Sequence, residues 1–433
     1  MMKVLIISSL VLSAPLSAQM VSLAIMPVLL FSALAISSSL NHLGLMNYDM
    51  VSAGLLVMVF WVTLLMKLSQ FHAPFKSSLF LLFLVLSLSL ILSFSTNNIM
   101  MFYFFFEWSL LPIFMIVIGW GYQMERLRAS LFMLFYTLFA SLPLLIMIIN
   151  IISSSHITVM YMYACLTSMP QSGKSLTVML IGAFLVKFPM FFVHQWLPKA
   201  HVEAPVGGSM ILAGVLLKLG GYGLLRISPL LGPSSVLSKV LIISMWGGGM
   251  LSAVCISLSD LKVMIAYSSV VHMALIIAGC TSASSWGANG AMIIMIAHGV
   301  CSSGMFSFAN MMYERSHSRN LVQNKGMLNM LPAMSMMWFM LCVANFGGPF
   351  TYNLLGEILL IVNLISLSGP LLMSVGLMSF FSAAYSLILY ASTQQGLPLG
   401  SVFSMSNMSY REILIGMSHI WPIFLMLLSP SLI

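Results

Sequence analysis

The chain has 433 residues, of which 61% are hydrophobic and only 6% are charged, with 16 Lys and Arg against 8 Asp and Glu and a net charge of +8. A soluble domain carries roughly 25% charged residues, which keep its surface wet. These values exclude a soluble globular enzyme and a disordered protein, and the basic residues form no patch that could bind nucleic acid, so the sequence indicates a polytopic membrane protein.

Apolar runs of about 20 residues, the length needed to cross the hydrocarbon core, divide the chain into about fourteen predicted transmembrane helices. The N-terminal run, with Lys3 before it and Ala14-Pro15-Leu16-Ser17-Ala18 at its end, also resembles a signal peptide. Runs of the same apolar composition continue through the chain, which favours a first transmembrane helix over a signal peptide. The predicted ranges are 3–18, 20–39, 50–68, 78–95, 98–120, 128–152, 174–196, 206–226, 238–257, 262–280, 287–312, 327–346 continuing as 353–367, 371–392 and 411–430.

The distribution of Lys and Arg among the loops predicts the orientation, because positive residues favour the cytoplasmic or matrix side. With an even number of helices, both termini are then expected on the opposite side. The loops after odd-numbered helices hold ten basic residues: Lys67, Lys76, Arg126, Arg128, Lys199, Lys262, Arg315, Arg319, Lys325 and Arg411. The other side holds four: Lys3, Lys174, Arg226 and Lys239.

The five cysteines form no CxxC pair and none lies near a His at ligand spacing, so they are interpreted as small apolar packing residues. The sequence has no GxxxxGK[ST], no GxGxxG after a strand and no HExxH. It therefore predicts no metal, cofactor or nucleotide site on this chain. The cysteines are Cys165, Cys255, Cys280, Cys301 and Cys342.

Four charged residues lie inside apolar runs rather than in loops: Glu107, Lys187, Lys218 and Glu357. A charge at the centre of a membrane helix costs roughly 2.5–3.5 kcal/mol, so the four together cost on the order of 10 kcal/mol. One interpretation is two static Glu–Lys ion pairs that hold helices together. The other is a series of protonatable groups in a hydrated path, in which the position of each neighbour decides whether a group holds its proton.

Two histidines, His272 and His298, lie inside consecutive predicted helices between the lysines and Glu357. A single His in a helix is usually a hydrogen-bonded core residue, but imidazole also exchanges protons near neutral pH. Their placement makes a relay and a core role equally acceptable. His194 and His201, at the end of the Lys187 helix, are weaker candidates.

Two predicted helices contain breaks next to a buried charge. Pro189 follows Lys187 by two residues, and Gly347-Gly348-Pro349 precedes Glu357. Proline removes a helical hydrogen bond, and broken helices beside ionisable residues are typical of inverted-repeat transporters. Ordinary proline kinks are the alternative. The 170-residue separation of Lys187 and Glu357 fits two five-helix repeats, with predicted divisions at 1–77, 78–230 (helices 4–8), 231–395 (helices 9–13) and 396–433.

The remaining charges are interpreted as interfacial anchors and loop ion pairs. They comprise Asp49, the Glu125-Arg126-Leu127-Arg128 segment, Asp260-Leu261-Lys262 and Glu314-Arg315.

The segment VKFPMFFVHQWLPKAHVEAPVGGSMILAGVLLKLGGYGLLR (186–226) closely resembles the subunit 4 family among the antiporter-like membrane-arm subunits of respiratory complex I. Further segments share the resemblance: FYFFFEWSLLPIF (102–114), SDLKVMIAYSSVVHM (259–273), AHGVCSSGMFSFANMMYERSHSR (297–319) and NLLGEI (353–358). One departure is that the family usually has Ala-Pro-Pro before the helix-12 glutamate, where the corresponding stretch of this chain is Gly347-Gly348-Pro349-Phe350, with Phe in place of one proline.

The resemblance implies a fourteen-helix antiporter-like fold and a proton-translocating module driven by NADH-to-ubiquinone electron transfer elsewhere. It implies a relay through Glu107 of helix 5, Lys187 of broken helix 7, Lys218 of helix 8, His298 of helix 11 and Glu357 of helix 12, to which His272 is added by its position. Flavin, iron–sulfur clusters, NADH and ubiquinone are then expected on other subunits.

The resemblance further implies neighbouring antiporter-like subunits and phospholipids such as cardiolipin as partners, and no nucleic acid. The high Met content, 41 residues, is similar to that of mitochondrially encoded proteins and implies the inner mitochondrial membrane, with both termini on the intermembrane-space side. Two alternatives remain: a subunit of a multisubunit cation/proton antiporter, and a static scaffold between pump modules.

Overall fold

The computed structural model describes residues 49–71, 73–160, 174–232, 234–397 and 406–428. The predicted spans 3–18 and 20–39 and Cys165 lie outside these residues. Helices dominate the described part of the chain, in the order α3 (Met50–Ser69), α4 (Lys76–Ser95), α5 (Ile99–Trp108), α6 (Leu110–Trp120), α7 (Arg126–Ser155), α8 (Lys174–Lys187), α9 (Trp196–Glu203), α10 (Val206–Ile211), η2 (Leu212–Leu216), α11 (Leu217–Leu231), α12 (Ser235–Cys255), α13 (Leu261–Thr281), α14 (Ser285–Ser316), α15 (Met327–Met330), α16 (Pro332–Asn345), α17 (Tyr352–Leu367), α18 (Pro370–Gln394), α19 (Tyr410–Leu425) and η4 (Met426–Leu428).

Several of these helices begin where a short polar side chain satisfies a free backbone amide. Asn98 accepts a hydrogen bond from the amide of Met100 at the start of α5. Ser234 and Ser284 do the same for the amides of Leu237 and Gly287, at the starts of α12 and α14. Such caps stabilise a helix by about 1 kcal/mol, and they place the turns between successive apolar runs.

Within the described residues, nine helical segments are long and apolar enough to cross a membrane. The other predicted spans after residue 49 correspond to the interrupted pairs α8–α9 and α16–α17 and to α19. The prediction of an all-α polytopic fold is confirmed. The total of fourteen helices stays a prediction, because its first two members are not described.

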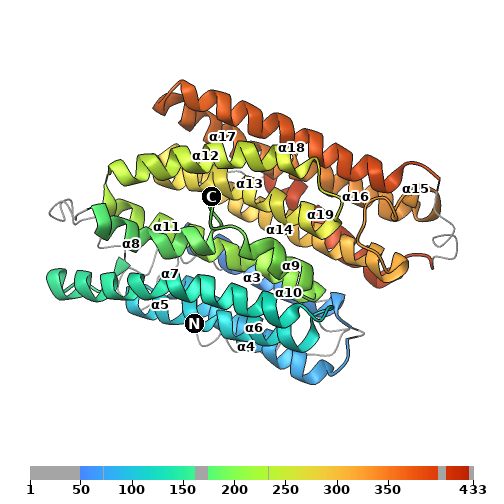
Figure 1. Cartoon of the computed structure of the whole chain (residues 1–433), viewed down its shortest axis with the longest axis horizontal. Coiled ribbons are helices and arrows are strands. Elements are labelled where there is room, and N and C mark those ends of the chain that lie inside the picture. The colour runs from blue at the N-terminus through green and yellow to red at the C-terminus, as the bar shows by residue number, and fades with distance from the viewer. Residues whose placement is uncertain (1–48, 72, 161–173, 233, 398–405, 429–433) are drawn as a thin grey trace.

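The helices run roughly parallel to the long axis of the molecule (Figure 1). Helices α4 to α7 lie along the lower edge of the view and α18 along the upper edge, with α11, α13 and α14 between them. The most apolar stretch of α14 is completely buried, and those of α11 and α13 are 89% buried. The core is therefore built around three helices that reach neither edge.

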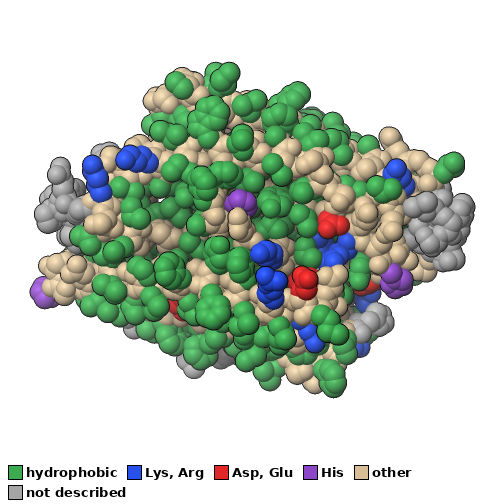
Figure 2. Space-filling model, in the orientation of Figure 1, with side chains coloured by type: hydrophobic (Ala, Val, Ile, Leu, Met, Phe, Trp, Pro, Cys, Tyr) green, Lys and Arg blue, Asp and Glu red, His purple; other side chains and the backbone are tan. Residues whose placement is uncertain are grey.

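The outward faces are apolar, as expected where lipid or a neighbouring subunit replaces water. Hydrophobic side chains cover most of the face in Figure 2, while Lys, Arg, Asp and Glu gather mainly to the right of centre. Phe135, Phe139 and Ile146 of α7 and Phe380 of α18 are each more than 60% exposed. Apolar patches of this extent mark a membrane or subunit interface.

Both predicted helix breaks are present. Helix α8 ends at Lys187, and turns occupy the chain before α9 begins at Trp196. Helix α16 ends at Asn345, and six residues separate it from α17. In the second break Gly347 has φ 68° and Phe350 has φ 64°. Proline is restricted to φ near −65°, so the loop adopts at Phe350 a conformation that the usual proline of the family would forbid.

Two of the roles predicted for charged loop residues are wrong. Lys262 is not an interfacial anchor: it lies in the first turn of α13 and is only 2% exposed. Glu314 and Arg315 do not pair with each other. Glu314 accepts a hydrogen bond from Asn310 at 2.7 Å, and Arg315 forms a two-pronged pair with Glu412 at 2.7 and 3.0 Å. Side chains 97 residues apart thus join α14 to α19.

Asp49 forms an ion pair, as predicted: its carboxylate lies 2.5 Å from the guanidinium of Arg226. This pair attaches the start of α3 to α11. It lies partly exposed, where ion pairs contribute little to stability.

Replacing Glu412 with Gln is expected to destabilise the protein by about 3–5 kcal/mol, the cost of leaving one buried partner of an ion pair uncompensated. Both side chains are 7% exposed, and the Glu412 carboxylate also accepts the Ser409 amide in a capping box. The thermal unfolding midpoint of the purified assembly measures the effect. Glu314→Gln, at an exposed position, is the control, and an equal shift in both variants would contradict the prediction.

Candidate functional site

Lys218 lies in the first turn of α11, directly after the π-helix η2, and only 1% of the residue is exposed. Its Nζ donates to the Ala213 carbonyl oxygen at 2.5 Å. A π-helical turn shifts backbone hydrogen bonds out of the regular pattern and often occurs at functional sites. Here it provides the carbonyl that holds the buried ammonium group in place.

His298 of α14 is the second partner of Lys218. Its Nδ1 lies 3.1 Å from the Lys218 Nζ. The close approach depends on two glycines, because a Cβ on Gly299 would lie 2.9 Å from the Gly214 carbonyl oxygen and 2.5 Å from Met58. The small residues let α14 approach η2 until the two side chains are within hydrogen-bonding distance.

His272 of α13 extends this arrangement towards α17. Its ring centroid lies 5.2 Å from that of His298, and its Nδ1 lies 3.8 Å from the Glu357 Oε1. Both nitrogens of His272 and the Nε2 of His298 are buried and have no hydrogen-bond partner among the described residues. Asn345 lies close enough to His272 to interact with it, but it makes no hydrogen bond of normal geometry to these nitrogens, which can exchange protons with one another or through a bridging water.

Glu357 lies beside the break between α16 and α17. Its Oε1 accepts a hydrogen bond from Asn353 at 3.2 Å, and 13% of its side chain is exposed. A Cβ on Gly347 would lie 2.5 Å from its Oε2. The glycine therefore lets the interrupted backbone fold closely around the carboxylate.

The structure thus brings four of the six predicted residues together: Lys218, His298, His272 and Glu357, from four different helices. We refer to them as the central row. Each member can hold or release a proton, and each lies next to the following one. Lys218, His298 and His272 are each only 1% exposed, whereas Glu357 keeps 13% of its side chain exposed at the end of the row.

Lys187 and Glu107 lie next to each other but apart from the central row. The Nζ of Lys187, which is 3% exposed, donates to the Phe106 carbonyl oxygen and lies 3.2 Å from the centre of the Phe106 ring. It is close enough to Glu107 for the two charges to interact. However, no Glu107–Lys187 ion pair within 4.0 Å forms in the described residues, and both carboxylate oxygens of Glu107 lack a hydrogen-bond partner there. The predicted pair is an adjacency, not a direct contact.

Glu107 also lines a cavity of ≈ 320 Å³ between α5, α6 and α7. The remaining lining is aromatic and aliphatic, including the half-exposed Phe104 and Trp108. The residue thus lies between the buried Lys187 and a cavity whose lining reaches the outer face of the molecule.

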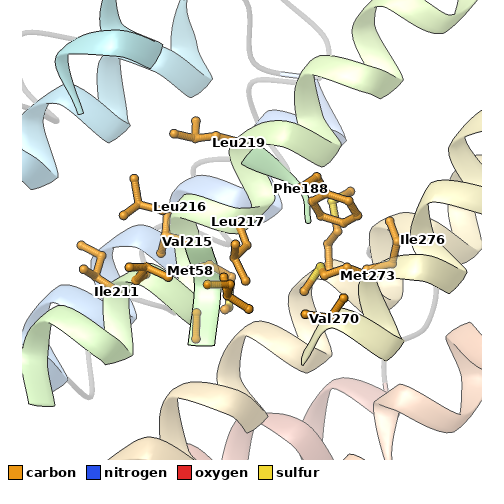
Figure 3. Packing of buried hydrophobic residues seen from close by; sticks show 14 of the residues in the cluster. Met58, Phe188, Ile211, Val215, Leu216, Leu217, Leu219, Val270, Met273 and Ile276 are labelled. Atoms are coloured by element: carbon orange, nitrogen blue, oxygen red, sulfur yellow. The ribbon is translucent and has the colours of Figure 1, made fainter. Parts of the chain in front are cut away.

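Apolar packing separates Lys187 from Lys218. A Cβ on Gly220 of α11 would lie 2.7 Å from Phe188, the residue after Lys187, so the two helices are in close contact. No hydrogen bond or ion pair joins the two lysines among the described residues. Figure 3 shows part of this packing, whose fully buried members include Phe188, Leu217, Leu219 and Met273.

Sequence reasoning missed a second group of buried polar residues. They lie at the end of the molecule that carries Glu125, Arg128 and Lys199, which we call the charged end. Glu203 of α9 is 4% exposed, Lys262 of α13 is 2% exposed and His201 of α9 is fully buried. Of these three, the sequence indicates only His201 as a relay candidate, and a weak one, while Lys262 is expected to be a loop anchor. The signal available was a carboxylate between two prolines, Pro198 and Pro205, but hydropathy does not distinguish such a residue from a loop anchor.

Within the described residues no group of three or more His, Cys, Asp or Glu side chains could hold a metal ion. The described cysteines are free and buried, and Cys301 donates to the Leu341 carbonyl oxygen at 3.4 Å. They thus pack among helices, as the sequence predicted.

Comparison with known proteins points to one family. Residues 96–383 match the family model described as NADH:quinone oxidoreductase/Mrp antiporter, TM. The chain is 43% identical to NADH-ubiquinone oxidoreductase chain 4 of Ceratitis capitata, over 93% of this chain and 91% of that protein. It is 49% identical to the Aedes aegypti protein of the same name, over 76% of this chain and 74% of that one.

Two solved structures share the fold. A chain of respiratory complex I from Thermus thermophilus with bound NADH superposes with a TM-score of 0.85 at 21% identity, covering 98% of this chain and 93% of that chain. A chain of an archaeal membrane-bound sulfane sulfur reductase superposes with a TM-score of 0.81 at 19% identity, covering 93% and 70%. The fold, the family model and the identity to curated relatives agree, and the chain belongs to the NADH-ubiquinone oxidoreductase chain 4 family.

Proposed function

We propose that this chain is a proton-translocating subunit in the membrane arm of an NADH:ubiquinone oxidoreductase, respiratory complex I. It moves protons from the matrix to the intermembrane space, coupled to electron transfer from NADH to ubiquinone in other subunits. Family membership supports the assembly. The single observation that carries the proton path is the 3.1 Å separation between Lys218 Nζ and His298 Nδ1 inside the core.

The central row can pass a proton with little movement of heavy atoms. A charged Lys218 donates to His298 Nδ1, which is an acceptor when the imidazole is neutral. When the proton shifts to Nδ1, Lys218 becomes a neutral amine and His298 an imidazolium. Loss of the Nε2 proton towards His272, and then transfer to the Glu357 carboxylate, returns His298 to neutrality with its other nitrogen protonated. Rotation of the ring or a second proton exchange resets it.

We further propose that Glu107 controls the charge of Lys187. In the observed arrangement the ammonium group is held by the carbonyl oxygen and ring of Phe106, while Glu107 acts on it only through space. Movement of the carboxylate towards Lys187 stabilises the charged lysine, and movement towards the outer cavity removes that stabilisation. A neighbouring subunit at this apolar face could drive the exchange.

The remaining assignments follow from the same proposal. Flavin, iron–sulfur clusters, NADH and ubiquinone belong to other subunits; the partners are neighbouring membrane-arm subunits and phospholipids such as cardiolipin, with no nucleic acid. The location is the inner mitochondrial membrane, with both termini on the intermembrane-space side. The two inverted repeats occupy 78–230 and 231–395, flanked by 1–77 and 396–433.

The two alternatives have less support. A subunit of a cation/proton antiporter shares the family model, but the curated relatives described above are NADH-ubiquinone oxidoreductase subunits. A static scaffold requires buried charges to be paired directly, whereas Glu107 and Lys187 form no ion pair within 4.0 Å among the described residues. Unsatisfied buried groups destabilise a purely structural element.

Replacing Glu357 with Gln tests the proposal. The amide keeps the shape and the hydrogen bond from Asn353 but cannot take up a proton as a carboxylate does. In the assembled complex reconstituted into vesicles, we expect fewer protons moved per NADH oxidised, and slower coupled turnover. Glu314→Gln is the matched control at an exposed position. An unchanged proton-to-NADH ratio in Glu357→Gln would refute the proposed path.

A further inference from the structure

The charged end of the protein contains a cavity that the central row does not reach. It has a volume of ≈ 370 Å³ and lies between α7, α9 and the start of α13. Glu125, Arg128 and Lys199 line it together with Glu203. A space of this size holds several water molecules, and the charged groups provide the polar partners that buried water needs.

Glu203 is the only one of these four charged residues that is buried, with 4% of the residue exposed. It lines the cavity, yet its Oε2 has no hydrogen-bond partner and it forms no ion pair within 4.0 Å in the described part of the chain. An unpartnered buried carboxylate oxygen is costly and calls for an explanation. A group that exchanges protons with water in the cavity is such an explanation.

Lys262 lies next to Glu203, on the side of α13. Its Nζ donates to the Ala204 carbonyl oxygen at 3.4 Å and lies 4.7 Å from the centre of the Tyr122 ring. It interacts electrostatically with both Glu203 and Arg319. The weak hydrogen bond and the absence of a direct carboxylate contact leave the ammonium group able to move between partners.

His201 of α9 is close enough to both Lys262 and Lys218 for the charge of each lysine to act on it. It is fully buried, and neither ring nitrogen has a hydrogen-bond partner among the described residues. Its ring stacks on Phe306 with centroids 4.4 Å apart and planes 7° from parallel. Stacking fixes the plane of the imidazole and leaves both nitrogens at its edge available for proton exchange.

We propose that Glu203 is the proton-uptake site at the charged end of the protein, and that Lys262 and His201 carry the proton from it to Lys218. This inference rests on the proposed function. A proton from the aqueous phase reaches the Glu203 carboxylate through water in the cavity, Lys262 and His201 pass one proton inwards, and Lys218, as a neutral amine, receives it while Glu203 regains its negative charge. The path enters the central row at Lys218 and avoids the apolar packing around Phe188, so Lys187 controls transport by its charge without passing protons to Lys218.

Glu203→Gln in the assembled complex, reconstituted into vesicles, tests the inference. The amide is nearly isosteric and cannot carry the proton. We expect the proton-to-NADH ratio and the coupled turnover to fall as far as in Glu357→Gln. Asp260→Asn is the matched control, because this carboxylate lies at the same end of the protein but is exposed. Glu203→Asp, which retains a carboxylate, is expected to recover part of the lost transport.

Two outcomes separate failure of this inference from failure of the proposed function. If Glu357→Gln impairs transport and Glu203→Gln does not, the uptake site is wrong while the function stands. If neither variant impairs transport, the proposed function fails as well. Should Glu203→Gln prevent assembly, His201→Phe provides the test, because phenylalanine keeps the stacking on Phe306 and removes both nitrogens. Normal pumping in an assembled His201→Phe complex would overturn the proposed path.

Discussion

Replacing Lys218 with Met is expected to slow coupled NADH oxidation by roughly a hundredfold, at the low end of the cost of removing a positioned proton-transfer group. Met fills a similar volume but has no nitrogen to bond Ala213 and His298. The central row then loses the member that meets protons from the charged end. Turnover and proton movement by the reconstituted complex measure the effect.

The same preparation provides two controls for this variant. Lys239→Met replaces an exposed lysine of α12 and is expected to leave transport unchanged. The amount of assembled complex separates loss of transport from loss of folding. A Lys218→Met complex that assembles fully and pumps as well as the Lys239→Met complex would show that the central row carries no protons.

The second large effect is expected from Glu107 and Lys187, whose single variants should not be additive. Glu107→Gln removes the negative charge that acts on Lys187, and Lys187→Met removes the group on which Glu107 acts. If the two residues work as one switch, each single variant and the double variant lose coupled pumping to about the same extent. The proton-to-NADH ratio of all three complexes, measured in parallel, tests this expectation.

A second pair of variants, at residues that do not interact, provides the control for additivity. Glu314→Gln combined with Lys187→Met should give the sum of its separate effects, because Glu314 lies on α14 at an exposed position and has no contact with Lys187. If Glu107→Gln and Lys187→Met were equally additive, the adjacency seen in the structure would have no functional meaning.

The four residues of the central row could be selected from the sequence because an ionisable side chain inside an apolar run is conspicuous. Lys218, Glu357 and the two histidines between them could be selected by their positions alone, and the breaks by proline and glycine. These signals are local. They show that a residue is buried, and they say much less about which other buried residue it meets.

The features that sequence reasoning missed depend on packing between distant segments. The π-helix before Lys218 has no composition that marks it, and Arg315 meets Glu412 rather than the adjacent Glu314. Lys262 and Glu203 lie near helix ends, where the hydropathy pattern is the same for an interfacial anchor as for a residue covered by other helices. Only the fold distinguishes the two cases.

The apolar packing around Phe188 has a consequence for energy conservation. An unbroken file of exchangeable groups from one face of the bilayer to the other would let the gradient discharge backwards whenever the driving reaction paused. A segment packed with apolar side chains interrupts such a file and blocks the leak, and its low dielectric constant transmits an electric field better than water does. A change of charge at Lys187 can therefore alter the electrostatic potential at the other half of the subunit without any proton passing between them.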